Sequence, residues 1–339
     1  YHDIKIIGGV FDGNGAVAAA GKADSPSMLR FGHGSNLTFE GVTFKNPYDN
    51  HQMEFAACKG ITIKNCVFDG FIPKSGKTGA KAVNYANNEA LQFDIMHNAS
   101  HFTQYPYYDD TACQDIVVDG CTFTNLQRGL GTHSAVAGSY FTNISFTNNT
   151  FTNIGGYAIA ATNFKNAVIS GNNISDCGAG IIFRNMVQSH DTFYSPLSGS
   201  FTVDHDAASV IENNTIKLTD KKYTNANPYG ILLYGEVVKK DIPNDDGKDK
   251  VPAGDYTLYG VKVNNNTITM KNGGYGIWLQ STNTCDVTNN AVTMDVPASA
   301  SGKGNCDPTR LVKSKNINIK NNSFVIKKNN KKTKKACGI

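Results

Sequence analysis

Three short stretches of the chain carry side chains suited to acid and base chemistry on a bound molecule. Glu54 lies in the run QMEFA, Asp94 ends the run EALQFD, and His133 lies in the run RGLGTHS. Two carboxyl groups on opposite sides of a bound sugar perform glycoside hydrolysis, because one protonates the leaving oxygen and the other activates water or attacks carbon. These runs indicate a catalytic site if the fold brings them together.

A short motif that recurs along nearly the whole chain predicts this fold. The pattern apolar-x-apolar-x-x-Asn-x-apolar occurs as VKVNNNTI, CDVTNNAV and INIKNNSF. Its column of asparagines comprises Asn149, Asn172, Asn214, Asn266, Asn290 and Asn322. Amides stacked at one turn hydrogen-bond one another, as in other stacked β-structures. A second short strand precedes each motif, and the period of roughly 22 to 27 residues suits a solenoid of three short strands per coil.

The composition agrees with one β-rich unit. The 339 residues include 33 glycines, few charges and a net charge of +4. Part of this charge lies in the run KKNNKKTKK, so we expect a solenoid over 1–326 and a basic tail over 327–339. No apolar run is long enough to span a membrane. The chain starts at Tyr1 inside an apolar-periodic run, which predicts that another domain or an N-terminal segment covers this end.

The eight cysteines include two pairs with one spacing. In a repeat array Cys66 lies over Cys121, and Cys58 lies over Cys113. This pattern fits buried thiols that fill the interior. At least one disulfide is the alternative, with Cys306 and Cys337 as the more plausible bridge. No spacing of cysteine and histidine indicates a zinc site, so we expect no metal and no other cofactor.

The asparagine column, the coil length and the opening IIGGVFDGNG resemble right-handed parallel β-helix enzymes of the pectate lyase and polygalacturonase superfamily. The resemblance covers Ile4 to about Ile326. It implies an all-β, single-domain right-handed parallel β-helix with loop insertions beside one face. The NTD, DD, GHG and RIK signatures of polygalacturonases are absent, so the resemblance implies the fold and not that family's catalytic residues.

Alternating residues of the first strand in each coil should point inward, and the residues between them should form two outward columns. The inward residues are Leu29, Met53, Leu91, Leu130, Ile159, Ile181, Ile231 and Ile277. One outward column is Arg30, Glu54, Gln92, Gly131, Ala160, Ile182, Leu232 and Trp278. The next is Gly32, Ala56, Asp94, His133, Thr162, Arg184, Tyr234 and Gln280. Asp94 is therefore expected beside His133 at a spacing of ~4.8 Å, and roughly 8 Å from Glu54.

The expected catalytic residues are Asp94 as acid, poised by His133, and Glu54 as base, although the two carboxyl roles are interchangeable at this point. We expect the following residues to bind substrate: Gln52, Glu89, Gln92, Arg128, Arg184, Tyr107, Asp109, Asp110, Tyr234 and Trp278. The arginines would hold substrate oxygens or lower carboxyl pKa values. The aromatic rings would stack on sugars. The insertions that should surround this face are 72–88, 96–112, 186–207 and 235–256.

The leading interpretation is an extracellular or cell-surface glycoside hydrolase that acts on a poly- or oligosaccharide. A polysaccharide lyase or epimerase on uronic acids is one alternative, in which an arginine neutralises the substrate carboxylate and His133 or a tyrosine removes a proton. A non-catalytic glycan-binding solenoid is the other alternative. Nucleic acid is not an expected partner, because the basic residues are dispersed and the expected site is partly acidic.

Overall fold

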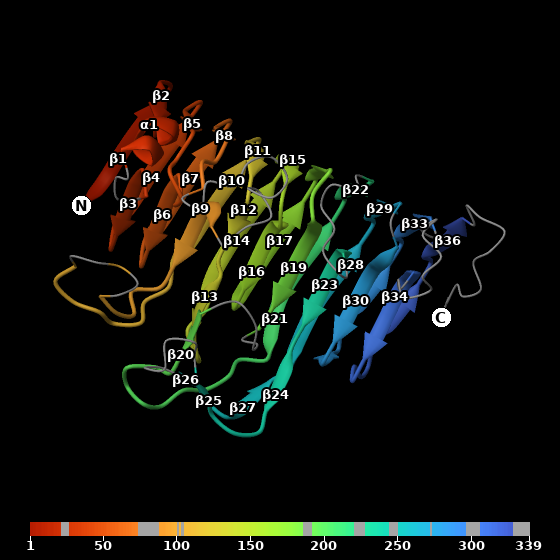
Figure 1. Ribbon diagram of the computed structural model, residues 1–339. Coiled ribbons are helices and arrows are strands. Elements are labelled where there is room, and N and C mark those ends of the chain that lie inside the picture. The colour runs from red at the N-terminus through yellow and green to blue at the C-terminus, as the bar shows by residue number, and fades with distance from the viewer. Residues whose placement is uncertain are drawn as a thin grey trace.

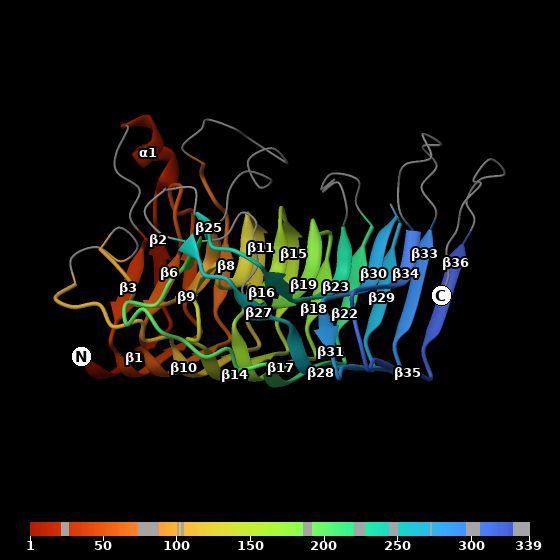
Figure 2. The ribbon, with the colours of Figure 1, turned by 90° about the horizontal axis from the view of Figure 1, so that it is seen from below.

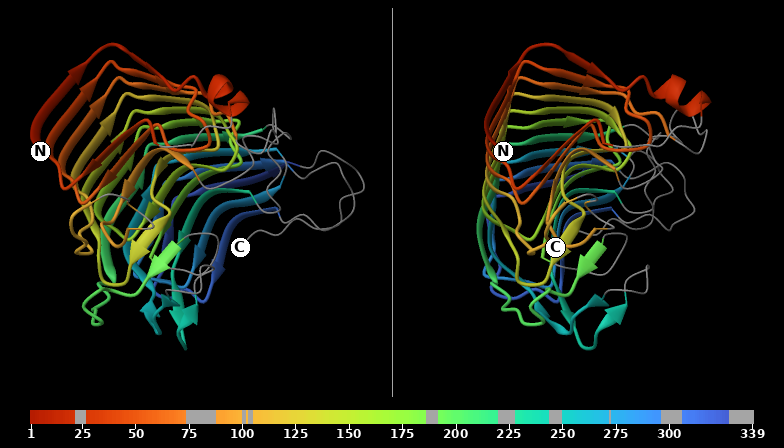
Figure 3. Two further views of the ribbon diagram at one scale, coloured as in Figure 1. Left: turned by 60° about the vertical axis from the view of Figure 1, so that its left-hand side comes forward. Right: turned by 90° about the vertical axis from the view of Figure 1, so that its left-hand side faces the viewer.

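The structure is a computed structural model of the chain. It describes residues 1–21, 27–73, 88–99, 102, 105–185, 192–219, 228–243, 250–271, 273–295 and 306–327. The strands stack in sequence order from the N-terminal to the C-terminal end (Figure 1). Viewed nearly along the stack, successive coils follow almost the same path around one interior (Figure 3). This arrangement confirms the predicted right-handed parallel β-helix.

Three long parallel sheets, one for each strand of a coil, form the solenoid. Sheet A contains β1 (His2–Ile7), β4 (Ser35–Glu40), β7 (Lys59–Lys64), β10 (Gln114–Asp119), β14 (Phe141–Thr147), β17 (Phe164–Ser170), β21 (Asp206–Glu212), β28 (Leu258–Asn264), β32 (Asp286–Thr288) and β35 (Asn318–Lys320), and β31 (Thr282–Asn283) pairs with β28. Sheet B contains β2 (Val10–Asp12), β5 (Thr43–Lys45), β8 (Val67–Asp69), β11 (Thr122–Leu126), β15 (Thr150–Ile154), β18 (Asn173–Ser175), β22 (Thr215–Leu218), β29 (Thr267–Met270), β33 (Ala291–Asp295) and β36 (Ser323–Lys327). Sheet C contains β3 (Leu29–Gly32), β6 (Met53–Ala56), β9 (Glu89–Asp94), β12 (Arg128–Gly131), β16 (Tyr157–Thr162), β19 (Ala179–Arg184), β23 (Tyr229–Tyr234), β30 (Gly274–Gln280) and β34 (Cys306–Val312).

Most of the smaller strands lie in the expected insertions 186–207 and 235–256, but one, Ser134–Val136, lies outside all of the expected insertions. The pairs are β13 (Ser134–Val136) with β20 (Thr192–Tyr194), β24 (Glu236–Val238) with β27 (Gly254–Tyr256), and β25 (Ile242–Pro243) with β26 (Lys250–Val251). Figure 1 shows them gathered at one margin of the coils, and Figure 2 shows the stack from a second side. The short helix α1 (Gly15–Ala20) follows β2. Within the ranges given above, no helix has the length and hydropathy needed to cross a bilayer.

The predicted asparagine stack is confirmed. The Nδ2 of each amide donates to the Oδ1 of the next, at 2.9 to 3.1 Å, from Asn149 through Asn172, Asn214, Asn266 and Asn290 to Asn322. The same Nδ2 atoms also donate to backbone carbonyls such as that of Ile169. The ladder therefore satisfies amide groups that would otherwise be buried without hydrogen bonds.

Each ladder asparagine follows a residue in the left-handed region, which turns the chain from sheet A to sheet B. Asn148, Asn213 and Asn265 have φ values of 55°, 55° and 56°, and Gly171 has 68°. Asparagine and glycine adopt this conformation at low cost. This preference explains why the repeated motif reads Asn-Asn or Gly-Asn at the turn.

Aromatic side chains stack in register inside sheet B. Phe11, Phe44, Phe68, Phe123 and Phe151 form a continuous column with ring centroids 4.7 to 5.3 Å apart. Such burial of apolar area is the main favourable contribution to folding. Aliphatic residues continue the column in later coils, as the strand pairing shows.

The cysteine columns lie in the interior as predicted. The N–H of Cys58 donates to Cys113 Sγ at 3.3 Å, and that of Cys66 donates to Cys121 Sγ at 3.4 Å. All cysteines in the described part of the chain are buried free thiols, Cys306 included, and Cys337 lies outside the described residues. The basic run after Lys327 also lies outside the described residues.

Candidate functional site

Many of the side chains predicted to form the site lie on the outer face of sheet C. The strand pairing places Arg30, Glu54, Gln92, Gly131, Ala160, Ile182, Leu232, Trp278 and Arg310 in one column across neighbouring strands. The predicted inward column from Leu29 to Ile277 is also confirmed by this pairing. Alternation within a strand therefore predicts this column of side chains.

Glu54 lies in a buried hydrogen-bonded group near the N-terminal end of this face. Its side chain is 6% exposed, and Arg30 Nε lies 2.8 Å from its Oε2. Arg30 Nη2 donates to Oε1 at 3.1 Å, and Ser27 Oγ donates to Oε2 at 2.7 Å. The Arg30 guanidinium lies 4.1 Å from the ring centroid of Phe102, which comes from the 96–112 insertion. Both oxygens of Glu54 are therefore engaged by protein groups.

Glu89 is the centre of a second buried group. Its side chain is 0% exposed, Arg128 Nη1 donates to Oε1 at 3.0 Å, and His133 Nδ1 donates to Oε2 at 2.7 Å. The His51 ring stacks on His133 at 6.0 Å, and its Nδ1–H donates to the backbone oxygen of Glu89 at 2.6 Å. Glu89 was expected to bind substrate. Its buried side chain links β9 to β12 through the ion pair with Arg128.

Asp94 and His133 were expected side by side, but the pairing of β12 with β9 ends before His133, and the His133 hydrogen bond goes to Glu89. The pairing of β12 with β16 ends at Gly131, whose φ is 139°. Beyond this residue the chain leaves sheet C for β13, so the register that predicted the pair does not continue. A β-carbon at Gly131 would lie 2.0 Å from the backbone oxygen of Ala160, which explains why this departure occurs at a glycine.

The predicted residues around Asp94 are buried as well. Asp94 is 1% exposed, and it accepts hydrogen bonds from the N–H of Ile95 at 2.7 Å and from Gln92 Nε2 at 3.2 Å. Gln52 is 0% exposed, and its Nε2 donates to three backbone carbonyls, including that of Phe44 at 3.3 Å. Gln52 therefore holds a turn of the solenoid.

A stripe of aromatic residues occupies the C-terminal half of the same face. Tyr157 stacks on Tyr229 at 5.8 Å, and Tyr275 lies 4.5 Å from Trp278. The Arg310 guanidinium lies 4.9 and 5.4 Å from the centroids of the last two rings. Tyr157, Trp278, Tyr234 and Arg310 are partly exposed. We call the set Tyr157, Tyr229, Tyr234, Tyr275, Trp278 and Arg310 the aromatic stripe.

Alternation alone misses three tyrosines of this stripe. Tyr157, Tyr229 and Tyr275 are each two residues before an inward isoleucine, yet they pack in the outer cluster with Ile182 and Leu232. The next residue in the later coils is a glycine, and a β-carbon on Gly230 would lie 2.7 Å from a backbone oxygen of the adjacent strand. The repeated Tyr-Gly at the start of YGILLY and YGIWLQ was the available signal.

Arg184 lies between the two halves of the face and is 2% exposed. Its Nε donates to Thr162 Oγ1 at 2.9 Å, and its guanidinium lies 5.9 Å from the Phe193 ring centroid. Tyr107, in contrast, is 53% exposed, and its ring lies 4.5 Å from that of His33. These two expected substrate ligands lie in different surroundings, and only Tyr107 is open to solvent.

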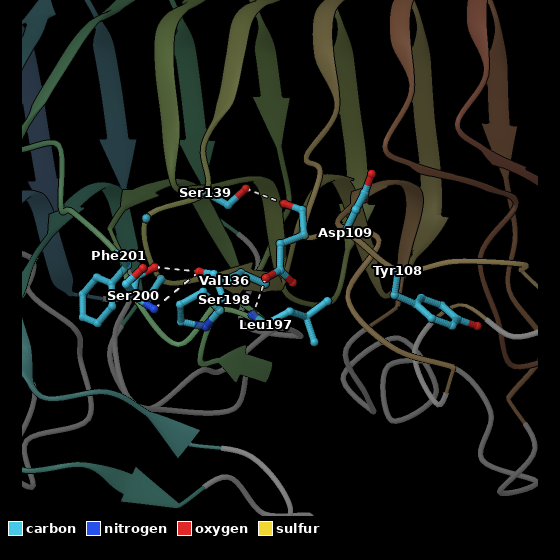
Figure 4. A pocket seen from close by; sticks show the side chains of 12 residues that line it. Tyr108, Asp109, Val136, Ser139, Leu197, Ser198, Ser200 and Phe201 are labelled. Atoms are coloured by element: carbon cyan, nitrogen blue, oxygen red, sulfur yellow. Dashed lines mark hydrogen bonds between the residues drawn. The ribbon is translucent and has the colours of Figure 1, made fainter.

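Asp109 and Asp110 line an open pocket beside the coils. The pocket has a volume of about 310 Å³, and Figure 4 shows its side chains. The lining residues are Tyr108, Asp109, Asp110, Val136, Ala137, Gly138, Ser139, Pro196, Leu197, Ser198, Ser200 and Phe201. Three segments that are distant in the sequence thus build one concave site. No group of metal-ligating side chains occurs among the described residues.

This geometry favours holding a ligand over acid and base catalysis. The described contacts show Glu54 and Glu89 bound to cationic side chains, and Asp94 bound to amide donors, all three buried. General acid or base catalysis requires a group to reach the reacting atoms within hydrogen-bond distance. The partly exposed residues of sheet C include Tyr157, Tyr234, Trp278 and Arg310, whose rings and guanidinium can bind sugars through stacking and hydrogen bonds.

The buried groups predict a loss of stability in acid. Burial alone raises the pKa of the Glu89 carboxyl, but His133 and Arg128 outweigh burial and hold this pKa well below its usual value of 4.5. Burial lowers the pKa of His51 below its usual value of 6.5, against the opposing influence of Glu54 and Glu89. Both groups therefore take up protons more readily in the unfolded chain. We expect the free energy of unfolding to fall as the pH drops below 6.5 and again below 4.5.

Urea unfolding at several pH values, followed by circular dichroism, measures this dependence. His51→Asn keeps an N–H donor near the Glu89 carbonyl but does not titrate, so it should remove the decrease that starts near pH 6.5. An unchanged pH profile in this variant would contradict the role of His51.

Comparisons with known proteins agree with the fold. A family model described as the right handed beta helix region matches residues 24–174 and 113–238. The plasmin and fibronectin-binding protein A of Streptococcus pneumoniae (strain ATCC BAA-255 / R6) is 24% identical over an alignment 301 residues long, which covers 81% of this chain and 40% of that protein. This chain therefore spans about two fifths of the length of that relative.

Two solved structures of PfbA from Streptococcus pneumoniae are also similar. One, described as a surface adhesin, has 18% identity and a TM-score of 0.60 over 98% of this chain and 72% of that chain. The other, described as a surface protein and adhesin, has 17% identity and a TM-score of 0.59 over 96% of this chain and 77% of that chain. At such identities the likeness demonstrates a shared fold and nothing finer.

Proposed function

We propose that this chain, which belongs to the right-handed β-helix family, is a non-catalytic binding module that holds a carbohydrate polymer against sheet C at the cell surface or outside the cell. One observation carries the proposal. The carboxylates predicted to catalyse hydrolysis are buried and engaged, whereas the aromatic stripe on the same face is partly exposed.

The form of the stripe supports a polymeric ligand. Its residues lie on β16, β23, β30 and β34, so the rings follow the axis of the solenoid across sheet C, with β19 between β16 and β23. Strands in a sheet lie about 4.8 Å apart, so a stripe across several strands is long enough for several sugar units. A chain of sugars offers apolar ring faces to the aromatic residues and hydroxyl groups to Arg310.

The similar proteins support a binding role outside the cell. The name of the curated relative states that it binds plasmin and fibronectin, and both similar structures are described as an adhesin. A β-helix with a rigid core supports such a role, because a preorganised surface loses little conformational entropy when a ligand binds.

Binding and cleavage are separated by one experiment on a panel of neutral and uronic glycans. Trp278 is the single tryptophan of the chain, so ligand binding at the stripe should change the intrinsic tryptophan fluorescence. We expect binding without release of reducing ends and without the ultraviolet absorbance of an unsaturated product. If the wild-type protein releases either product and Glu54→Gln or Asp94→Asn does not, the protein is a hydrolase or a lyase, and the proposal is overturned.

The variants of the stripe give the second arm of the test. Trp278→Ala should weaken glycan binding about tenfold or more, as large aromatic residues at the centre of a binding surface often do. The matched control is Tyr259→Ala on β28 of sheet A, which should bind like the wild type. Calorimetry measures both affinities, and circular dichroism confirms folding. Equal affinity in Trp278→Ala and the wild type would place the binding surface elsewhere.

Fibronectin and plasmin, immobilised separately, serve as further ligands in the same assay. Binding to either protein that persists after its glycans are removed, together with no binding to any free glycan, would replace the carbohydrate partner by a protein partner.

A further inference from the structure

The pocket lined by Asp109 is separate from the aromatic stripe and is built from three segments. The 96–112 insertion supplies Asp109 and Asp110, the turn after β13 supplies Ser139, and the loop after β20 supplies Leu197 and Ser200. Figure 4 shows side chains that line this pocket, with Asp109, Ser139, Leu197 and Ser200 labelled. None of the residues of the stripe lines this pocket.

Asp110 holds the three segments together. Its Oδ1 lies 2.5 Å from Nδ1 of His97, and its Oδ2 accepts the N–H of Leu197 at 2.6 Å. Its backbone oxygen accepts Ser139 Oγ at 2.7 Å. His97 is 3% exposed and packs on Tyr194 of β20 with ring centroids 4.2 Å apart. These contacts keep the pocket preformed, so a ligand meets walls that need little rearrangement.

Asp109 gives the pocket its charge. Its carboxylate is 39% exposed, and its Oδ1 accepts the N–H of Thr111 at 3.1 Å. His33 Nε2 lies 3.8 Å from this oxygen, beyond hydrogen-bond distance. The described lining contains two carboxylates and neither lysine nor arginine. The serine hydroxyls add few donors, because Ser139 Oγ donates to Asp110 and Ser198 Oγ donates to the backbone oxygen of Ser200.

The other walls of the pocket are apolar. Val136 and Ala137 form its inner side, and Pro196 and Leu197 form part of its rim. Leu197 is 56% exposed. A carboxylate beside apolar walls suits a cation on a hydrocarbon stem, because the stem is removed from water while the charged end makes strong hydrogen bonds.

We propose that this pocket binds a primary ammonium group on an aliphatic stem, as in a lysine side chain of a partner protein. The ammonium group donates hydrogen bonds to the Asp109 carboxylate, and the methylene groups lie against Pro196 and Leu197. The excess of acceptors and negative charge disfavours uronic acids, phosphates and sulfates. This site would add a protein contact to the carbohydrate surface proposed above, but it does not depend on that surface.

A titration of the protein with Nα-acetyl-lysine methylamide, monitored by the NMR chemical shifts of the protein, tests the proposal. Nα-acetyl-norleucine methylamide has the stem without the ammonium group and should bind at least about tenfold more weakly. Asp109→Asn should weaken binding of the lysine probe by at least about tenfold, because asparagine keeps the oxygen for Thr111 N–H but loses the charge.

Two further variants make the test specific. Leu197→Lys places an ammonium group on the rim, where it competes for Asp109, and should also reduce binding. Asp3→Asn on β1 removes one exposed charge that does not line the pocket, and should leave binding unchanged. Equal binding of the lysine and norleucine probes, or unchanged binding in Asp109→Asn, would overturn the proposal. Asp109-dependent binding of glucose but not of the lysine probe would also overturn it and identify a saccharide subsite.

Discussion

Glu89→Gln is expected to lower the free energy of unfolding by about 3–5 kcal/mol, which is the usual effect of breaking a buried ion pair from one side. Glutamine has nearly the shape of glutamate, so the loss is electrostatic. Arg128 is 6% exposed and His133 Nδ1 lies 2.7 Å from the carboxylate, so both lose a charged acceptor in a buried place. Urea unfolding at neutral pH measures the effect.

The control for this prediction is an exposed ion pair on sheet A. Asp115→Asn removes a charge that lies 3.8 Å from Lys59, with side chains 40% and 68% exposed. Surface pairs contribute at most about 1 kcal/mol because water and salt screen them. A loss in Glu89→Gln no larger than that in Asp115→Asn would show that the buried group does not stabilise the fold.

Asn214→Ala is expected to cost about 3 kcal/mol, because it interrupts the middle of the asparagine ladder. Asn214 Nδ2 donates to the Ile169 carbonyl at 2.9 Å and to Asn266 Oδ1 at 2.9 Å. Its Oδ1 accepts from both the N–H and the Nδ2 of Asn172. The substitution leaves these neighbours buried without a partner at this position, and leaves a small cavity.

Asn173→Ala in β18 is the matched control, because this asparagine is exposed and lies directly after a ladder position. We expect a change within about 0.5 kcal/mol for such a surface residue. Thermal and urea unfolding of the two variants, compared with the wild type, measure the difference. Similar stability of both variants would indicate that the ladder specifies the turn without stabilising the coil.

The carboxylates predicted to act in hydrolysis are buried on the outer face of sheet C. Glu54 and Asp94 are predicted to lie on adjacent strands, and the pairing of β6 with β9 confirms that these strands are neighbours. The same residues are 5% and 1% exposed. Position on the sheet is therefore compatible with catalysis, while burial and the Arg30 contact favour a structural role for Glu54.

The solenoid, the inward and outward columns and the stacked amides and thiols are predictable from the residue pattern alone. These features depend on alternation within a strand and on a repeat between coils, and both are local patterns that residue types report directly. The column from Arg30 to Trp278 and the ladder from Asn149 to Asn322 were predictable for this reason.

The partner of His133, the burial of the carboxylates and the pocket of Asp109 depend on tertiary contacts and are not predictable from the residue pattern. The first depends on where β12 ends, since a register holds only while strands stay paired. The second depends on side chains such as Phe102 that come from insertions and fold back onto the sheet. The pocket joins Asp110 to Leu197, 87 residues apart, and neither alternation nor repetition encodes such a contact.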